Sequence, residues 1–79
     1  MKVKVMYFAS LRDSASVSHE MIDTELETID ELFESLNNKY SFKIEKKHLR
    51  VAINEEYKSF DSKIVNNDTI VFIPPVAGG

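Results

Sequence analysis

The sequence TIVFIPPVAGG, residues 69–79, ends the chain and does most to decide its fold. Residues 69–73 are apolar on both faces of an extended chain, which is typical of a strand in the middle of a sheet. Pro74 ends this strand, because proline has no N–H group to donate to a neighbouring strand. All the glycine and proline of the chain, two of each, lies in residues 74–79. Small strand-rich proteins normally place glycine in turns, so we infer that this terminal glycine pair serves another purpose.

The rest of the chain alternates between strand and helix patterns. Working back from the end, we predict strands at residues 49–53 and 56–58, and near the start strands at 2–8 and 17–22 joined by a loop or short helical turn at 9–16. A helix is predicted to begin after Thr28, because Thr28 and Glu31 have the spacing of a capping box. One apolar stripe follows at helical spacing: Ile29, Leu32, Phe33, Leu36 and Tyr40.

This order of elements predicts an α+β fold. Two strands, one main helix and then strands that return to the same sheet are the β-grasp arrangement, with a mixed four- to five-stranded sheet and the helix on one face. We expect the last strand to lie in the middle of the sheet, beside the first and parallel to it. The chain of 79 residues fits one domain, residues 1–79, with a flexible Gly-Gly tail at 74–79.

Composition excludes several classes of function. The net charge of −3 argues against a nucleic-acid partner. No apolar run is long enough to span a membrane and no signal peptide opens the chain, so we expect a cytoplasmic protein. There is no cysteine, and His19 and His48 are too far apart in sequence to suggest a metal site. Without a nucleophile, a metal set or a phosphate loop, we expect no enzyme activity from this chain on its own.

Strand phase predicts an exposed apolar patch beside the tail. Val3 and Val5 share one face of the first strand, and Met6 and Phe8 share the other. If the valines face the helix, the outer face of the sheet carries Met6, Phe8, Val71 and Ile73. Large exposed apolar patches usually mark interfaces, so we interpret this one as a docking surface.

The tail offers chemistry of its own. Pro74-Pro75 favours a stiff extended backbone, and residues 74–79 can reach about 20 Å into a partner. Gly78 and Gly79 have no side chains, so the terminal carboxylate can enter a narrow slot. Activation by ATP would turn this carboxylate into an acyl-adenylate, and a sulfur donor could then convert it into a thiocarboxylate.

Three stretches carry a resemblance to a known family: residues 5–13, residues 51–54 and, most specifically, residues 67–79. They resemble the family of molybdopterin synthase small subunits, which are sulfur carriers with a ubiquitin-like β-grasp fold. The resemblance spans the whole chain. Asn67 stands where the family usually has glycine, and asparagine also tolerates a left-handed backbone.

The resemblance implies a mechanism and a set of partners. An E1-like enzyme would use ATP to adenylate Gly79, and sulfur transfer would give a Gly79 thiocarboxylate, with Gly78 supplying clearance. The tail would then enter the large subunit of a heterotetrameric synthase, which holds the cyclic pyranopterin precursor, while this chain itself would bind no cofactor. The partner-binding residues implied are Phe8, Met6, Tyr57, Val71, Ile73, Pro74, Pro75, Val76 and Ala77.

Other interpretations of the sequence stay open. A ubiquitin-like modifier would join Gly79 to lysines of other proteins through the same carboxyl chemistry. A sulfur carrier of a thiazole or thiolation pathway would also end in Gly-Gly, and a pure interaction domain would have an inert tail. Acidic residues concentrate between 13 and 38 and basic ones between 39 and 50, which predicts either electrostatic steering or an ordinary solvated surface.

Overall fold

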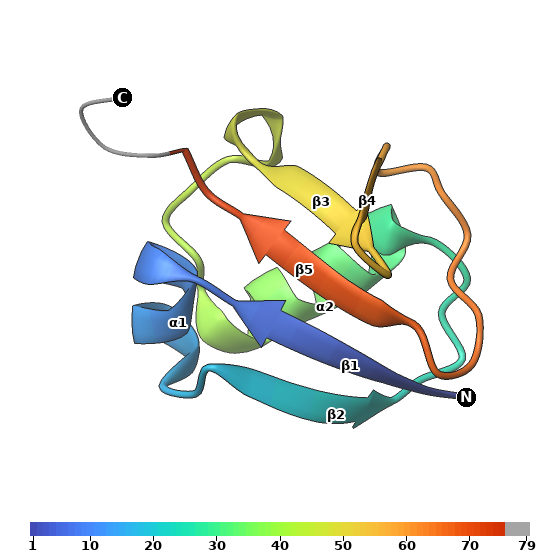
Figure 1. Ribbon diagram of the computed structural model, residues 1–79. Helices are drawn as coiled ribbons and strands as arrows, with labels where there is room; N and C mark the ends of the chain where they lie inside the picture. The colour runs from blue at the N-terminus through green and yellow to red at the C-terminus, as the bar shows by residue number, and fades with distance from the viewer. Residues whose placement is uncertain (76–79) are drawn as a thin grey trace.

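The computed structural model describes residues 1–75, which form one five-stranded sheet with helices against it (Figure 1). In chain order the elements are β1 (Lys2–Tyr7), α1 (Ala9–Ala15), β2 (His19–Asp23), α2 (Ile29–Tyr40), a 3₁₀ helix η1 (Lys46–His48), β3 (Arg50–Ile53), β4 (Glu56–Lys58) and β5 (Thr69–Ile73). The predictions for Val76, Ala77, Gly78 and Gly79 fall outside the described residues.

The sheet has the order β2-β1-β5-β3-β4. Strands β1 and β5 are parallel, and every other neighbouring pair is antiparallel. The last strand therefore lies in the middle of the sheet beside the first, as predicted (Figure 1). Because β5 is held on both sides, the point at which the chain leaves the sheet is fixed by two ladders of backbone hydrogen bonds.

Helix α2 covers one face of the sheet and lies behind it in Figure 1. The predicted capping box is present: the Thr28 hydroxyl accepts from the Glu31 N–H at 3.2 Å, and Glu31 Oε1 accepts from the Thr28 N–H at 3.1 Å. The buried side of the helix presents Ile29, Leu32, Phe33 and Leu36 to the core. From the sheet the core receives Val3, Val5, Tyr7, Val51, Ile53, Ile70 and Phe72, which confirms the predicted strand phase.

The ends of several elements differ from the predictions. Strand β1 stops at Tyr7 instead of Phe8, and residues 9–15 form a seven-residue helix, longer than the loop or short helical turn predicted at 9–16. This helix is anchored because Leu11 and Ala15, four residues apart on one side of it, are buried. Ser16 ends it in a left-handed conformation with φ of 64°. The second strand then begins at His19, not Val17.

The third strand begins one residue later than predicted, at Arg50, because Leu49 closes the 3₁₀ helix η1 that the sequence pattern did not reveal. The strand at residues 56–58 and the strand at 69–73 have the predicted bounds.

Asparagine replaces glycine in the turns, as the composition required. Asn54 and Glu55 form the two-residue loop between β3 and β4 with φ of 52° and 73°, and Asn67 has φ of 74° in the turn before β5. Asp68, which is buried, joins these turns: its carboxylate accepts from Asn54 Nδ2 at 2.8 Å and from the Val65 N–H at 2.8 Å. This network fixes the start of β5, whose other end leads into the tail.

Candidate partner-binding site at the root of the tail

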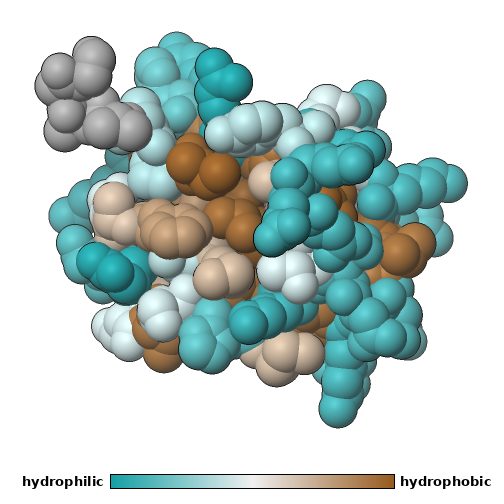
Figure 2. Space-filling model, in the orientation of Figure 1, coloured by the Kyte–Doolittle hydropathy of each residue, from teal (hydrophilic) through white to brown (hydrophobic). Residues whose placement is uncertain are grey.

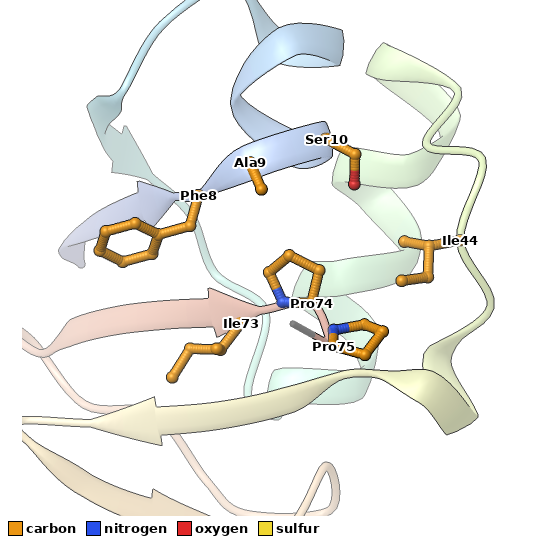
Figure 3. Close-up of a pocket in the computed structure, with 7 residues that line it drawn as sticks. All are labelled: Phe8, Ala9, Ser10, Ile44, Ile73, Pro74 and Pro75. Atoms are coloured by element: carbon orange, nitrogen blue, oxygen red, sulfur yellow. The ribbon is translucent and has the colours of Figure 1, made fainter. Parts of the chain in front are cut away.

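An open apolar pocket of about 550 Å³ lies where β5 ends. It is lined by Phe8, Ala9, Ser10, Ile44, Ile73, Pro74 and Pro75 (Figure 3). Three separate parts of the chain thus meet at this point: the start of α1, the loop after α2, and the residues that follow β5. Pro74 is buried and Pro75 is exposed, so the root of the tail is packed against the domain for one residue beyond the strand.

Phe8 is the largest exposed apolar side chain at the pocket. It leaves 45% of its surface accessible, because its backbone is still extended one residue after β1 and directs the ring away from the core. Ala9, the next residue, has φ of 49°, a left-handed conformation that costs about 1–2 kcal/mol for a residue other than glycine. This turn lets the chain enter α1 directly after placing Phe8 on the surface.

The outer face of the sheet, opposite α2, continues this apolar surface. The strand register aligns Tyr57, Ala52, Val71 and Met6 in one row across β4, β3, β5 and β1. Met6 and Val71 are half-buried, whereas Tyr57 leaves 68% of its surface exposed. Figure 2 shows apolar surface gathered on this face, over β1 and β5. We call Met6, Phe8, Tyr57, Val71 and Ile73 together the outer-face patch.

A second, smaller pocket of about 250 Å³ lies on the other flank of the tail root. Its lining consists of His48, Arg50, Tyr57, Ile73, Pro74 and Pro75. The Arg50 guanidinium carbon lies 5.8 Å from the centre of the Tyr57 ring, which is within range of a cation–π contact. The two pockets share Ile73 and both prolines, so the tail root separates an apolar hollow from a basic one.

A hydrogen-bonded cluster supports the strand that carries Phe8. The hydroxyls of Tyr7 and Tyr40 both donate to Oε2 of Glu20, each at 2.6 Å. Burial, followed by the hydrogen bond and the charge of Glu20, raises the pKa of Tyr7 well above its ordinary value of 10.0. The hydrogen bond from Tyr40 to Glu20, with a smaller contribution from burial, raises the pKa of Tyr40. The end of β1, strand β2 and the end of α2 are thereby held together directly behind the site.

Residues 5–79 match the ThiS family. The chain belongs to this family. This chain is 32% identical over 80 residues to the molybdopterin synthase sulfur carrier subunit of Haemophilus influenzae. The match covers 98% of this chain and 99% of the Haemophilus influenzae protein.

Solved structures of similar proteins agree with this membership. The putative molybdopterin converting factor subunit 1 of Pyrococcus furiosus has a TM-score of 0.80 and 30% identity, covering 96% of the ThiS-family chain and 99% of its own. Haloferax volcanii SAMP1 has a TM-score of 0.80 and 19% identity, covering both chains fully. The complex of subunits 1 and 2 of the Helicobacter pylori molybdopterin-converting factor matches with a TM-score of 0.71 and 24% identity, again over the full length of both chains. The Haloferax volcanii and Helicobacter pylori structures establish the shared fold, which confirms the predicted β-grasp fold. The match to the ThiS family and to the sulfur carrier subunits confirms the predicted family resemblance.

The structure brings most of the predicted docking residues of the ThiS-family chain together. Phe8, Ile73, Pro74 and Pro75 line the larger pocket, Met6 and Val71 are neighbours on β1 and β5, and Tyr57 lies across the tail root from Phe8. The sequence predictions missed Ala9, Ser10, Ile44, His48 and Arg50. Arg50 could have been found, because it alternates with buried Val51 on its strand and so faces outward.

Part of the charge separation seen in the sequence is neutralised within the chain. Lys46 contacts Asp30 and lies 3.4 Å from Glu34, and the hydrogen bond to Asp30 is the main cause of the raised pKa of Lys46. Lys47 lies 3.3 Å from Glu45.

Within residues 1–75 no group of three His, Cys, Asp or Glu side chains is arranged to hold a metal ion. No helix in that same part of the chain is long and apolar enough to cross a membrane.

Proposed function

We propose that this chain is the sulfur carrier subunit of a molybdopterin synthase and has no catalytic activity on its own. The observation that carries the proposal is the 32% identity to the Haemophilus influenzae sulfur carrier subunit over nearly the whole of both chains. The similarity to the Pyrococcus furiosus protein, at 30% identity, supports it independently.

The C-terminal carboxylate of Gly79 is the reacting group in this proposal. A carboxylate oxygen attacks the α-phosphorus of ATP in the active site of an E1-like enzyme, which forms the acyl-adenylate and releases pyrophosphate. A sulfur nucleophile then displaces AMP and leaves a thiocarboxylate on Gly79. Within the synthase this sulfur passes to the cyclic pyranopterin precursor. ATP belongs to the activating enzyme, and this chain binds no cofactor itself.

The domain positions the root from which the tail extends. Beyond Pro75 four residues remain, and at about 3.4 Å each they reach at most about 14 Å. A partner must therefore come close to the tail root to receive the carboxylate. The outer-face patch and the apolar pocket beside Pro74 and Pro75 supply the surface for that approach, which supports the large synthase subunit as the partner. The exchange takes place in the cytoplasm.

Intact mass spectrometry of the protein from native cells tests the proposal. A mass shift equal to the replacement of one oxygen by sulfur, located at Gly79, is the expected result. Reconstitution with the large subunit and the cyclic precursor should then produce molybdopterin. A ladder of conjugates through Gly79 without any thiocarboxylate would instead identify a ubiquitin-like modifier and overturn the proposal.

A further inference from the structure

We propose that the basic pocket formed by His48, Arg50 and Tyr57 binds a carboxylate side chain of the large synthase subunit when that subunit receives the tail. This inference rests on the proposed function and adds to it the chemistry of one contact. It also identifies Arg50 as a residue that selects the partner.

The geometry of the pocket favours a planar anion. Arg50 and Ile73 lie directly opposite each other on β3 and β5, so the arginine side chain extends over the outer face beside the tail root. The ring of Tyr57, 5.8 Å from the guanidinium carbon, supports the arginine on one side. A guanidinium group offers N–H donors in a fixed planar fork that matches the two oxygens of a carboxylate. The imidazole of His48, which lines the same pocket, can supply a further N–H donor.

Arg50 differs from Lys46, Lys47 and Lys58 because it makes no ion pair with any residue in the described part of the chain, 1–75. Lys46 is paired with Asp30 and Glu34, Lys47 with Glu45, and Lys58 with Glu56. Among residues 1–75, no carboxylate lies within ion-pair distance of Arg50. The chain carries a net charge of −3, so the molecule as a whole repels acidic groups. At the tail root, the charge of Arg50 creates a local attraction for such a group.

The position of the pocket indicates that the anion comes from a protein side chain and not from a reacting phosphate. The reacting carboxylate is four residues beyond Pro75, which places the chemistry up to about 14 Å from the tail root when the tail is extended. The pocket shares Ile73, Pro74 and Pro75 with the apolar pocket. A partner that covers the outer-face patch and surrounds the tail must therefore cover Arg50 as well, and an unpaired arginine buried there would weaken the complex unless an acidic group met it.

Titration of the large subunit with charge variants of this chain tests the inference. Arg50→Glu should raise the Kd about tenfold or more, because attraction is replaced by repulsion at a desolvated contact. Lys63→Glu makes the same change of charge in the exposed loop before β5 and should alter the Kd less than about twofold. Arg50→Gln, which removes the charge without reversing it, should raise the Kd severalfold. All three variants should melt like the wild type, because both side chains are exposed.

Compensating variants identify the partner group. Each acidic residue on the tail-binding face of the large subunit is changed in turn to lysine, and one such variant should bind the Arg50→Glu chain at least fivefold more tightly than the unchanged subunit does. If Arg50→Glu behaves like Lys63→Glu, or if no reversal restores binding, the inference is overturned while the proposed function stands. If inorganic phosphate alone competes with the large subunit at Arg50, the carboxylate assignment is wrong. If the wild-type chain does not bind the large subunit at all, the proposed function fails together with this inference.

Discussion

Tyr7 and Tyr40 meet edge to face, with ring centroids 6.0 Å apart and ring planes at 78°, and their hydroxyls donate to the same carboxylate oxygen. Tyr7 ends β1 and Tyr40 ends α2, so this pair joins the sheet to the helix at the edge nearest Phe8. The shared acceptor is Glu20 on β2. Burial is the main cause of the raised pKa of Tyr7, and the hydrogen bond to Glu20 adds to it, whereas the hydrogen bond to Glu20 is the main cause of the raised pKa of Tyr40.

This cluster predicts a loss of stability in alkaline solution. Both tyrosines have a pKa in the folded chain above the ordinary value of 10.0, so their contribution is complete below pH 10 and is lost as the pH rises towards the folded-state pKa. Tyr7→Phe should cost about 1.5–3 kcal/mol at neutral pH, because it removes a hydrogen bond to a charged group. It should also flatten the fall in the free energy of unfolding above about pH 10. Denaturant titrations across this range measure both effects.

Tyr57→Phe provides the matched control, since it removes an exposed hydroxyl that has no hydrogen-bond partner among the described residues. The wild type and Tyr57→Phe should show the same alkaline slope. An unchanged slope in Tyr7→Phe would mean that other groups govern unfolding at high pH.

The parts of the fold that the sequence predicts are those with local signals. Alternation of lysine with valine along β1 indicates that Val3 and Val5 face the core, as they do in the structure. Along β5, which is apolar on both faces, alternation shows only that Ile70 and Phe72 share a face, and the structure places that face in the core. The capping box at Thr28 is equally local, because all of its donors and acceptors lie within four residues. The pattern of elements predicts only an α+β fold with the helix on one face, and the central place of the last strand is inferred from the β-grasp topology.

The parts that could not be predicted depend on contacts between distant residues. Residues 9–15 contain only a few apolar side chains, and their helix forms because Leu11 and Ala15 find the core. Val17 has a strand-forming side chain but lies exposed before β2. In the site, Ile44 reaches the pocket from the loop after α2, a placement without a signal in the neighbouring sequence. Alternation gives the outward direction of Arg50, but its contact with Tyr57 depends on how β3 pairs with the adjacent strand β4.

The two-residue loop between β3 and β4 can be improved. Glu55 has φ of 73°, a conformation that glycine adopts without steric cost and that disfavours other residues by about 1–2 kcal/mol. Glu55→Gly would give Asn-Gly, the preferred pair for such a hairpin loop. After the entropy that glycine loses on folding, the variant should be about 0.5–1 kcal/mol more stable than the wild type. Glu55→Ala is the control and should bring no such gain, and equal melting temperatures for both variants would contradict the argument.

The role of the outer-face patch in partner binding can be tested by two substitutions, one within β1 and one directly after it. Phe8→Asp should weaken binding to the large synthase subunit by about 2 kcal/mol or more, because it replaces an exposed aromatic side chain at the proposed interface with a carboxylate. The fold should survive, since Phe8 is outside the core. Val5→Asp should instead lower the melting temperature strongly, because Val5 is fully buried and the new charge would have no partner there.

Thermal melts and titrations with the large subunit separate the two cases. If Phe8→Asp unfolds early, Phe8 contributes to the core more than its exposure indicates. If it melts normally and binds normally, the interface lies elsewhere on the molecule.

Gly79 carries the reacting carboxylate in the proposed function, so the length of the chain end should be critical for activity. Deleting Gly79 should abolish molybdopterin formation in a reconstituted system, because the terminal carboxylate moves back by one residue and no longer reaches the position where sulfur is transferred. Adding one alanine after Gly79 should have the same effect, since it displaces the carboxylate outward and places a Cβ atom where the proposed slot admits only glycine. Both changes leave every core residue of the described chain unaltered, so both variants should melt within a degree or so of the wild type. Full product formation by the shortened chain would exclude Gly79 as the sulfur-bearing residue, whereas early melting would show that the end of the chain stabilises the domain.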